Sequence, residues 1–180
     1  MSDPFADLGW LLDHVWTRLE RGARDASDPF RLVTLATTGP HGAEARMVGL
    51  RVADRMARTV EVHTDLRTAK VRAAMHDPRA ALLAWDTGAQ VQLRLSVMLE
   101  VIAADADRWS RIPAEARLNY GTDPAPGAPV DAPRQVTRTP DMARFAALQG
   151  KVFAIDILSL AHDPHRRARF DGTGGRWIAP

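Results

Sequence analysis

The sequence predicts a mainly β protein with flanking helices, built as an antiparallel barrel or sandwich. Residues 90–103 alternate polar and apolar side chains with a period of two, which is typical of a strand with one buried face. Residues 31–37 and 45–52 are also β-rich, and the turn residues between them join the two stretches into a hairpin. Both observations favour a sheet over a helical bundle.

The composition limits the kinds of chemistry that this chain can perform. Its 180 residues favour a single domain over residues 1–180, and a hydrophobic content of 46% supplies a sizeable core. The chain has no cysteine, which excludes disulfides and thiolate metal sites. Its histidines show no clear metal-ligand spacing, so no metal is expected.

The charge balance does not indicate a nucleic-acid partner, because the formal net charge is only +2. All of the 24 basic residues except Lys70 and Lys151 are arginines, which stay protonated and keep the sequence pI near 9.6. The N-terminus lacks a basic region followed by an apolar stretch, and no apolar run is long enough to span a bilayer. A cytoplasmic protein without a membrane partner is therefore expected.

The remaining elements follow from local patterns. Apolar side chains recur at steps of three and four near the N-terminus, which predicts an amphipathic helix over about residues 4–22. Further strands are expected at residues 59–64, 80–85, 152–158 and 167–170. Further helices are expected at residues 70–76 and 104–119. A last helix should run from Thr139, as cap before a proline, to a terminal Gly150.

The segment over about residues 121–135 contains too many prolines and glycines for regular structure. It is expected to be a long loop, which serves either as a lid or as a dimer contact.

The segment from His63 to Lys70 carries the most chemistry. Asp65 is a candidate N-cap for a helix that begins at Leu66, and the first turn of a helix offers free backbone N–H groups to an anion. Thr68 adds a hydroxyl, and Lys70 adds a cation beside that turn. A phosphomonoester needs several converging donors of this kind, so the segment predicts a phosphate site. A capped helix with a solvated basic edge is the alternative.

Two arginines lie five residues apart on one predicted strand. In a regular strand Arg46 shares a face with Val48, whereas Arg51 shares the opposite face with Met47. The two arginines therefore have different roles, unless a bulge at Gly49 resets the alternation. A surface charge remains the alternative for either side chain.

The long strand at residues 90–103 has one polar face. Gln90, Gln92, Arg94 and Ser96 lie on it, so this face meets either water or a ligand. An amide side chain offers a donor and an acceptor together, which suits a ligand edge with carbonyl and N–H groups.

The order and spacing of residues 46–51, 63–70 and 90–95 resemble the pyridoxamine 5'-phosphate oxidase family and its wider group of FMN-binding split barrels. The corresponding family segments run Arg-x-Val-Leu-Leu-Lys, Tyr-Thr-Asn-x-x-Ser-x-Lys and Gln-Val-x-Val. The resemblance implies an antiparallel split β-barrel that binds FMN at the interface of a homodimer.

The resemblance also implies which residues contact the cofactor. Arg46, Thr68 and Lys70 would lie at the FMN phosphate, Arg51 and Gln92 near the ring or ribityl chain, and Arg169 would reach the flavin from the tail. The full set of cofactor candidates is Arg46, Met47, Val48, Arg51, His63, Thr64, Thr68, Lys70, Gln92 and Arg169. No catalytic side chain is assigned, because the flavin itself carries the chemistry in such enzymes.

The C-terminal tail resembles the oxidases only in part. Aligned on Arg169, the chain has His165 and Arg167 where the oxidases place an arginine and a histidine against their substrate, and Ser159 where they place a tryptophan. His165 and Arg167 are thus substrate candidates, but for another substrate. The expected function is an FMN-dependent oxidoreductase of unknown substrate. The alternatives are a non-catalytic flavin-binding or stress-related protein, and a haem- or deazaflavin-binding split barrel.

Overall fold

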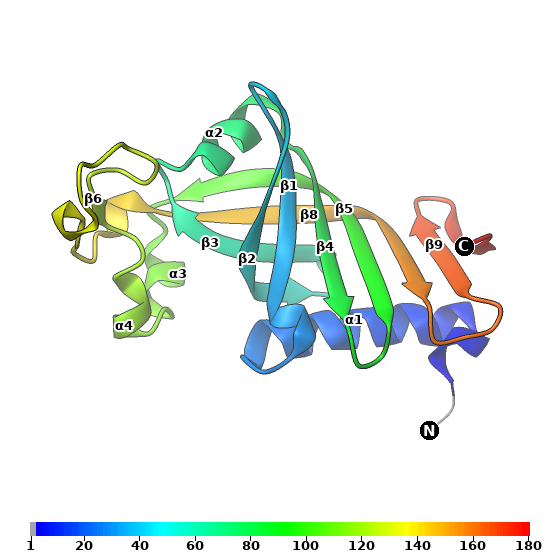
Figure 1. Cartoon of the computed structure of the whole chain (residues 1–180). Helices are drawn as coiled ribbons and strands as arrows, with labels where there is room; N and C mark the ends of the chain where they lie inside the picture. The colour runs from blue at the N-terminus through cyan, green and yellow to red at the C-terminus, as the bar shows by residue number, and fades with distance from the viewer. Residues whose placement is uncertain (1–2) are drawn as a thin grey trace.

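The computed structural model describes residues 3–180, which fold around one β-barrel (Figure 1). The helical elements are η1 (Pro4–Ala6), α1 (Leu8–Arg24), η2 (Pro29–Arg31), α2 (Ala69–His76), α3 (Ala106–Ser110), α4 (Ala114–Arg117), η3 (Pro133–Gln135) and η4 (Met142–Arg144). The strands are β1 (Leu32–Gly39), β2 (Gly42–Asp54), β3 (Thr59–Asp65), β4 (Arg79–Asp86), β5 (Val91–Ala103), β6 (Thr122–Asp123), β7 (Thr137–Arg138), β8 (Phe145–Ser159), β9 (Arg166–Asp171) and β10 (Gly174–Ile178). Within this part of the chain, no helix has the length and apolar character needed to cross a membrane.

Strand β8 closes the barrel because it pairs along both of its edges, with β3 on one side and β5 on the other. The ring runs β8-β3-β2-β1-β4-β5 and returns to β8, and every pairing in it is antiparallel. β9 and β10 extend the sheet from the second half of β8, away from the end that carries β6 (Figure 1). The predicted antiparallel barrel with flanking helices is confirmed.

Alternation along the strands fills the barrel with aliphatic side chains. Leu35 on β1, Leu50 on β2 and Leu95 on β5 are all buried in one cluster. Helix α1 runs along one side of the barrel (Figure 1) and adds Leu11 and Val15 to the same cluster. Burial of this apolar face, as predicted, fixes the helix on the barrel.

Helix α1 begins at Leu8, later than expected, because two separate caps divide the N-terminal segment. The Asp3 carboxylate accepts a hydrogen bond from the Phe5 backbone N–H and caps η1. The Asp7 carboxylate accepts one from the Trp10 N–H and caps α1.

The helix expected from Thr139 to Gly150 is wrong, because β8 occupies the second half of that segment. Only the single turn η4 precedes the strand, with Asp141 as its cap. Ala146 and Ala147 have no exposed surface, and their backbone lies between β3 and β5. Pairing on both edges outweighs the helix propensity of this alanine-containing stretch. Residues 152–158, expected as a separate strand, belong to the same β8.

Gly150 therefore ends no helix, and its small size serves packing instead. It lies opposite Leu99, beside the fully buried Val97 of β5. A Cβ atom at position 150 would lie 3.1 Å from the Val97 Cβ, which is closer than ordinary packing allows. Gly150 and Val97 are thus complementary in volume across the β5–β8 pair.

The helix expected at residues 104–119 is broken into α3 and α4. Asp105 caps α3 by accepting a hydrogen bond of 2.8 Å from the Arg108 N–H. Pro113, which has no N–H to donate, separates the two helices. Strand β10 was not predicted, because Gly174 and Gly175 interrupt any alternation there.

The segment over residues 121–135 is an irregular loop as expected, apart from η3 and the β6–β7 pair at its base. Gly121 begins this loop with a φ of 154°. A Cβ atom there would lie 1.7 Å from the carbonyl oxygen of Thr139, so only glycine fits.

Candidate functional site

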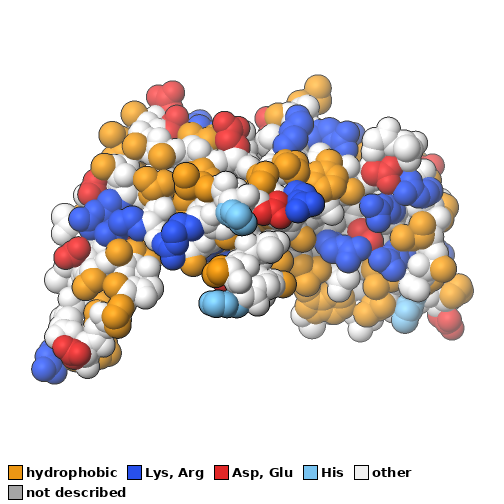
Figure 2. All heavy atoms as spheres, turned by 90° about the horizontal axis from the view of Figure 1, so that it is seen from above, with side chains coloured by type: hydrophobic (Ala, Val, Ile, Leu, Met, Phe, Trp, Pro, Cys, Tyr) orange, Lys and Arg blue, Asp and Glu red, His pale blue; other side chains and the backbone are white. Residues whose placement is uncertain are grey.

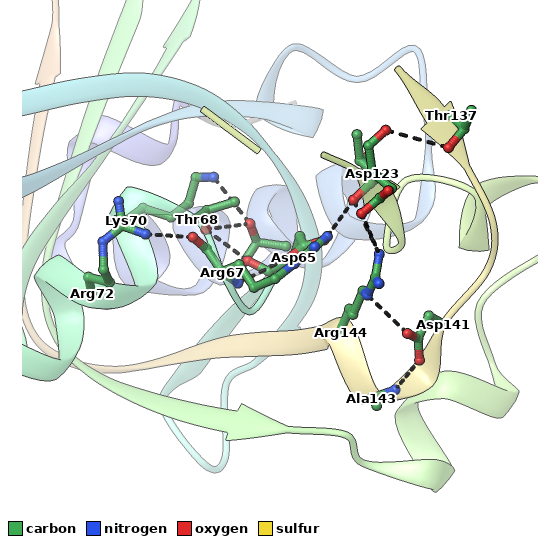
Figure 3. A network of polar contacts seen from close by, with 12 residues as sticks. Asp65, Arg67, Thr68, Lys70, Arg72, Asp123, Thr137, Asp141, Ala143 and Arg144 are labelled. Atoms are coloured by element: carbon green, nitrogen blue, oxygen red, sulfur yellow. Dashed lines mark hydrogen bonds and ion pairs between the residues drawn. The ribbon is translucent and has the colours of Figure 1, made fainter. Parts of the chain in front are cut away.

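The turn between β3 and α2 brings two hydroxyls and an ammonium group together. The Lys70 Nζ donates a hydrogen bond of 3.1 Å to the Thr64 Oγ1, which lies 3.2 Å from the Thr68 Oγ1 (Figure 3). One predicted detail is wrong, because α2 begins at Ala69 after Thr68 and not at Leu66. These three side chains nevertheless converge at the junction between β3 and α2.

Asp65 does not cap α2, because its carboxylate forms hydrogen bonds with Arg67. Its Oδ1 accepts from the Arg67 backbone N–H at 2.9 Å, and its Oδ2 accepts from the Arg67 Nη2 at 2.7 Å. The same Nη2 also donates to the Thr122 carbonyl at 2.6 Å, which ties the base of the long loop to this turn (Figure 3). Arg144 adds a second tie to the Thr122 carbonyl at 3.3 Å.

Arg46 adds a second cation beside Lys70. Burial lowers the pKa of Lys70, the positive charge of Arg46 lowers it further, and Asp65 acts in the opposite direction. Two cations that repel each other in the ligand-free protein are stabilised when a multiply charged anion binds between them. We refer to Arg46, Thr64, Thr68 and Lys70 as the cationic cluster.

The Arg46 guanidinium already has partners within the chain. Its Nη1 donates to the Thr37 Oγ1 at 2.7 Å, and its Nη2 lies 2.7 Å from the Glu44 Oε2. Arg46 stands opposite the buried Leu35 and so belongs to the inner face of the barrel wall. Met47 points outward and is 59% exposed, which confirms the predicted alternation at this end of the strand.

Arg51 lies on a β-bulge. Leu50 stands opposite Val62 and Val52 stands opposite Glu61, so Arg51 is the extra residue in β2. The bulge considered at Gly49 is therefore two residues later. A bulge was considered because it could give the two arginines the same role, but Arg46 and Arg51 still meet different surroundings.

Arg51 faces a cavity of about 660 Å³ between the barrel and the α3–α4 segment. We refer to it as the arginine cavity. Its lining includes Arg31, Arg51, Asp54, Glu61, His63, Arg108, Arg111, Ile112, Pro113 and Tyr120. Burial raises the pKa of the Tyr120 phenol, while the neighbouring Arg51 charge opposes that rise.

A polar pair forms one wall of the arginine cavity. The His63 Nε2 lies 2.8 Å from the Glu61 Oε1, and the Arg108 Nε donates to the Glu61 Oε2 at 2.9 Å. Glu61 is only 3% exposed. The His63 ring packs edge-on against Phe145 with a centroid distance of 5.0 Å, so its orientation is fixed by packing as well.

Gln92 lies on the outer face of the barrel, away from the cationic cluster. It stands opposite Trp85 on β4 and opposite Leu158 on β8. The next row of outward-facing residues that stand opposite one another on adjacent strands spans seven strands. It contains Met47, Thr34, Leu83, Arg94, Asp156, Arg169 and Arg176. We refer to Gln92, Arg94, Arg167 and Arg169 as the outer-face group. Figure 2 shows several basic side chains in the half of the molecule that carries β9 in Figure 1, and others in the opposite half.

The candidate residues of the C-terminal tail differ in whether they contact other residues of the chain. Arg167 forms a double hydrogen bond with Asp156, at 2.9 Å from Nε and 2.8 Å from Nη2. Arg94 donates to the same carboxylate at 2.7 Å. His165 is exposed just before β9, and the Arg169 Nε lies 3.4 Å from the Asp171 Oδ2. Arg167 is thus engaged within the chain, whereas His165 projects from the surface.

Sequence reasoning missed the Glu61–Arg108 contact and the role of Tyr120 in the arginine cavity. The alternation over residues 59–65 places Glu61 and His63 on one face, so their proximity could have been predicted from the sequence. The contact with Arg108 and Tyr120 could not, because these two residues follow β5 in the sequence and lie near β3 only in the folded chain.

Comparison with solved structures defines the class of protein. The chain has the split-barrel fold of a pyridoxamine 5'-phosphate oxidase-related, FMN-binding protein from Nostoc punctiforme PCC 73102, with a TM-score of 0.75 and 21% sequence identity. That comparison covers 93% of this chain and 96% of the other. The FMN-binding domain of pyridoxamine 5'-phosphate oxidase matches residues 13–103, just over half of the chain. The chain therefore belongs to the pyridoxamine 5'-phosphate oxidase FMN-binding domain family.

Two further solved structures share the fold. PhzG from Burkholderia lata 383, in complex with tetrahydrophenazine-1-carboxylic acid, has a TM-score of 0.73 and 18% identity over 100% of this chain and 98% of that one. A protein from Clostridium acetobutylicum related to general stress protein 26 has a TM-score of 0.62 and 14% identity, with 91% and 95% coverage. Comparison with curated proteins finds no match.

Proposed function

We propose that this protein binds FMN between two copies of the chain and acts as an oxidoreductase on a small molecule. The single observation that carries the proposal is the convergence of the Lys70 ammonium group with the Thr64 and Thr68 hydroxyls, where the positive charge of Arg46 also acts. This donor set fits a phosphate monoester, because it offers two cations and two hydroxyls to three acceptor oxygens.

The division of the site into two parts supports the dimer. The cationic cluster includes inner-face residues of the barrel wall, whereas the outer-face group lies on its outside, so one chain does not bring them to one ligand. A second copy would supply the missing part. The outer face also exposes apolar side chains such as Leu83 and Trp85, which are 37% and 41% exposed.

In this arrangement the cationic cluster would hold the phosphate, with Met47 and Val48 along the cofactor and His63 on the other face of β3, toward the arginine cavity. Gln92 and Arg169 of the partner copy face the flavin ring. The isoalloxazine, when bound, supplies two-electron redox chemistry. The protein residues bind and orient it, and Arg51 lies toward the arginine cavity, where a substrate would enter.

Titration with FMN tests this proposal through the quenching of flavin fluorescence. Arg46→Ala and Lys70→Ala should each weaken binding about 10- to 100-fold, the usual effect of losing a hydrogen bond to a charged group. Lys151→Ala, which removes the only other lysine, is the matched control and should bind like the wild type. Wild-type protein that does not bind FMN would sink the proposal, as would cluster variants that bind normally.

Simple measurements distinguish the proposed function from two alternatives. The visible spectrum of the purified protein distinguishes a flavin from a haem or a deazaflavin. A flavin-binding or stress-related protein without turnover would bind FMN but consume no oxygen with any amine or alcohol substrate. Pyridoxamine phosphate is the first compound to test, although the changed tail residues His165 and Arg167 favour a different substrate.

A further inference from the structure

The Glu61–His63 pair lies on the wall of the arginine cavity and is not part of the cationic cluster. Both residues come from β3, where Glu61 and His63 share the face opposite to Thr64. What the pair does in this cavity follows from three properties: the charge of Glu61, the free nitrogen of His63, and the surrounding arginines.

Glu61 is held as a carboxylate. Burial raises the pKa of its carboxyl group, but the hydrogen bonds from His63 and Arg108 and the Arg108 charge outweigh burial, so that the pKa lies below its ordinary value. Gln149 adds a donor at 3.4 Å from the Oε2. An ionised carboxylate accepts hydrogen bonds and donates none.

The state of Glu61 fixes the tautomer of His63. Because Glu61 only accepts, the Nε2 of His63 carries the proton that forms the 2.8 Å contact. The Nδ1 of a neutral ring is then an acceptor. Among residues 3–180 it has no hydrogen-bond partner. It is also not one of the buried unpaired side-chain atoms of that range, which are Arg18 Nε and Arg169 Nε, so it keeps some exposed surface, and His63 lines the cavity.

The ring cannot turn freely away from this position. His63 lies edge-on to Phe145 at 5.0 Å and to Tyr120 at 6.4 Å between ring centroids. A carboxylate on one nitrogen and two aromatic rings on its sides give the imidazole one orientation.

The charges around the cavity define the kind of molecule that fits. Arg31, Arg51, Arg108 and Arg111 face only two carboxylates, Asp54 and Glu61. Arg108 is neutralised by Glu61, and within residues 3–180 Arg31 donates only to the backbone carbonyls of Ala23 and Leu50. The remaining wall is apolar, with Ile112, Pro113 and Tyr120. An anion with an apolar body suits this combination.

We propose that His63, positioned by Glu61, accepts a proton from an N–H or O–H group of an anionic substrate bound in the arginine cavity. The step rests on the proposed flavin function, because flavin is its oxidant. Bound flavin would supply the two-electron oxidant, taking the hydrogen of the substrate C–H bond together with both electrons of that bond. The adjacent N–H or O–H proton moves to His63 Nδ1, and a C=N or C=O bond forms. Glu61 is the positioning residue, and Arg51 holds the acidic group.

Nitrogen-15 NMR of the histidine rings, recorded above neutral pH, tests the pair without any substrate. Wild-type His63 should show a protonated Nε2 and an unprotonated Nδ1, with its signal assigned by its loss in His63→Phe. Glu61→Gln should release the tautomer preference, because an amide can donate as well as accept. Glu100→Gln, on the exposed side of β5, is the matched control. A proton on Nδ1 in the wild type, or an unchanged tautomer in Glu61→Gln, would overturn the proposal.

Binding of small aromatic acids tests the substrate class in FMN-saturated protein. Benzoate and its three hydroxy isomers carry the same carboxylate, but only the isomers carry an O–H donor. At least one isomer should bind about 3- to 10-fold more tightly than benzoate, the usual effect of one hydrogen bond. His63→Phe should abolish that advantage, and Arg51→Gln should weaken all four acids. Arg134→Gln, in the exposed loop, should change nothing.

The two proposals fail in different ways. Absence of FMN binding by the wild type overturns the flavin function, whereas the tautomer of His63 is measured equally well in protein without FMN. FMN binding together with equal affinity for all four acids, or with no affinity for any of them, overturns the role of His63.

Discussion

The Nζ atom of Lys70 lies 3.1 Å from the Thr64 Oγ1, so helix α2 and strand β3 present an ammonium group and a hydroxyl side by side. Thr64 is buried, and its hydroxyl is therefore fixed by the strand. This contact gives the cationic cluster a defined shape before any ligand arrives, which lowers the entropic cost of binding.

The first prediction concerns the pH dependence of Lys70. Its lowered pKa means that the folded protein binds this proton less tightly than the unfolded chain does. The resulting destabilisation is full below the folded pKa and disappears as pH rises from that value through the unfolded value of 10.5. FMN affinity should change in the opposite sense, falling as pH rises through the folded pKa and the ammonium loses its charge.

Lys70→Met keeps the apolar stem and removes the charge. We expect this variant to equal or exceed the wild type in the free energy of unfolding without FMN, measured with urea near neutral pH. With FMN present it should gain much less stability than the wild type, because binding stabilises the folded state. A loss of more than about 1 kcal/mol without FMN would mean that Lys70 serves the fold and not a ligand.

The second prediction uses hybrid dimers. If the cationic cluster and the outer-face group of different copies build each site, Lys70→Ala and Arg169→Ala should each lose FMN binding as homodimers. When an equal mixture of the two variants is unfolded and refolded, random assembly makes half of the dimers hybrids, and each hybrid has one intact site out of two. About one quarter of all sites should therefore be restored. Bound FMN per chain measures the recovery.

A mixture of Lys70→Ala with Arg46→Ala is the control for this experiment. Both substitutions lie in the same half of the site, so hybrids contain no intact site and recovery is not expected. Equal recovery in both mixtures, or none in either, would show that the two groups do not meet across an interface.

The third prediction concerns a buried ion pair that joins α1 to the β4–β5 turn. The Arg18 Nη2 lies 2.6 Å from the Asp86 Oδ2, and both side chains are at most 11% exposed. Asp86→Ala should lower the free energy of unfolding by about 3 to 5 kcal/mol, because it leaves the Arg18 charge buried with only the more distant Asp28. Urea unfolding measures the change.

The exposed pair Arg55–Asp13 is the matched control, and Asp13→Ala should cost no more than about 1 kcal/mol. Equal effects of Asp13→Ala and Asp86→Ala would contradict the role given to burial.

The sequence predicted the strands of the ring best where one side of a strand faces the core. The alternation over residues 90–103 and the turn at residues 38–42 depend only on local chemistry, and β5 and the β1–β2 hairpin appear where expected. β8 was misassigned because its alanines favour a helix locally, and only the strands on both of its edges decide otherwise.

The residue types of the candidate site could be predicted from the sequence. How these residues are divided between the cationic cluster, the arginine cavity and the outer-face group could not. Arg46, Thr68 and Lys70 could be grouped from spacing and resemblance. In the structure Thr68 and Lys70 both contact Thr64, and the charge of Arg46 lowers the pKa of Lys70. That Arg51 occupies a bulge, and that Arg167 is engaged by Asp156, depends on the register of neighbouring strands. Register across a barrel is a property of the whole chain.

The two-sided pairing of β8 has a consequence for synthesis on the ribosome. β3 and β5 are complete by residue 103, but the strand that joins them begins only at Phe145. Until β8 has emerged, the nascent chain carries two unpaired strand edges, which are templates for association with other chains. The nascent protein therefore depends on protection of these edges from the completion of β5 at Ala103 until β8, Phe145–Ser159, has emerged.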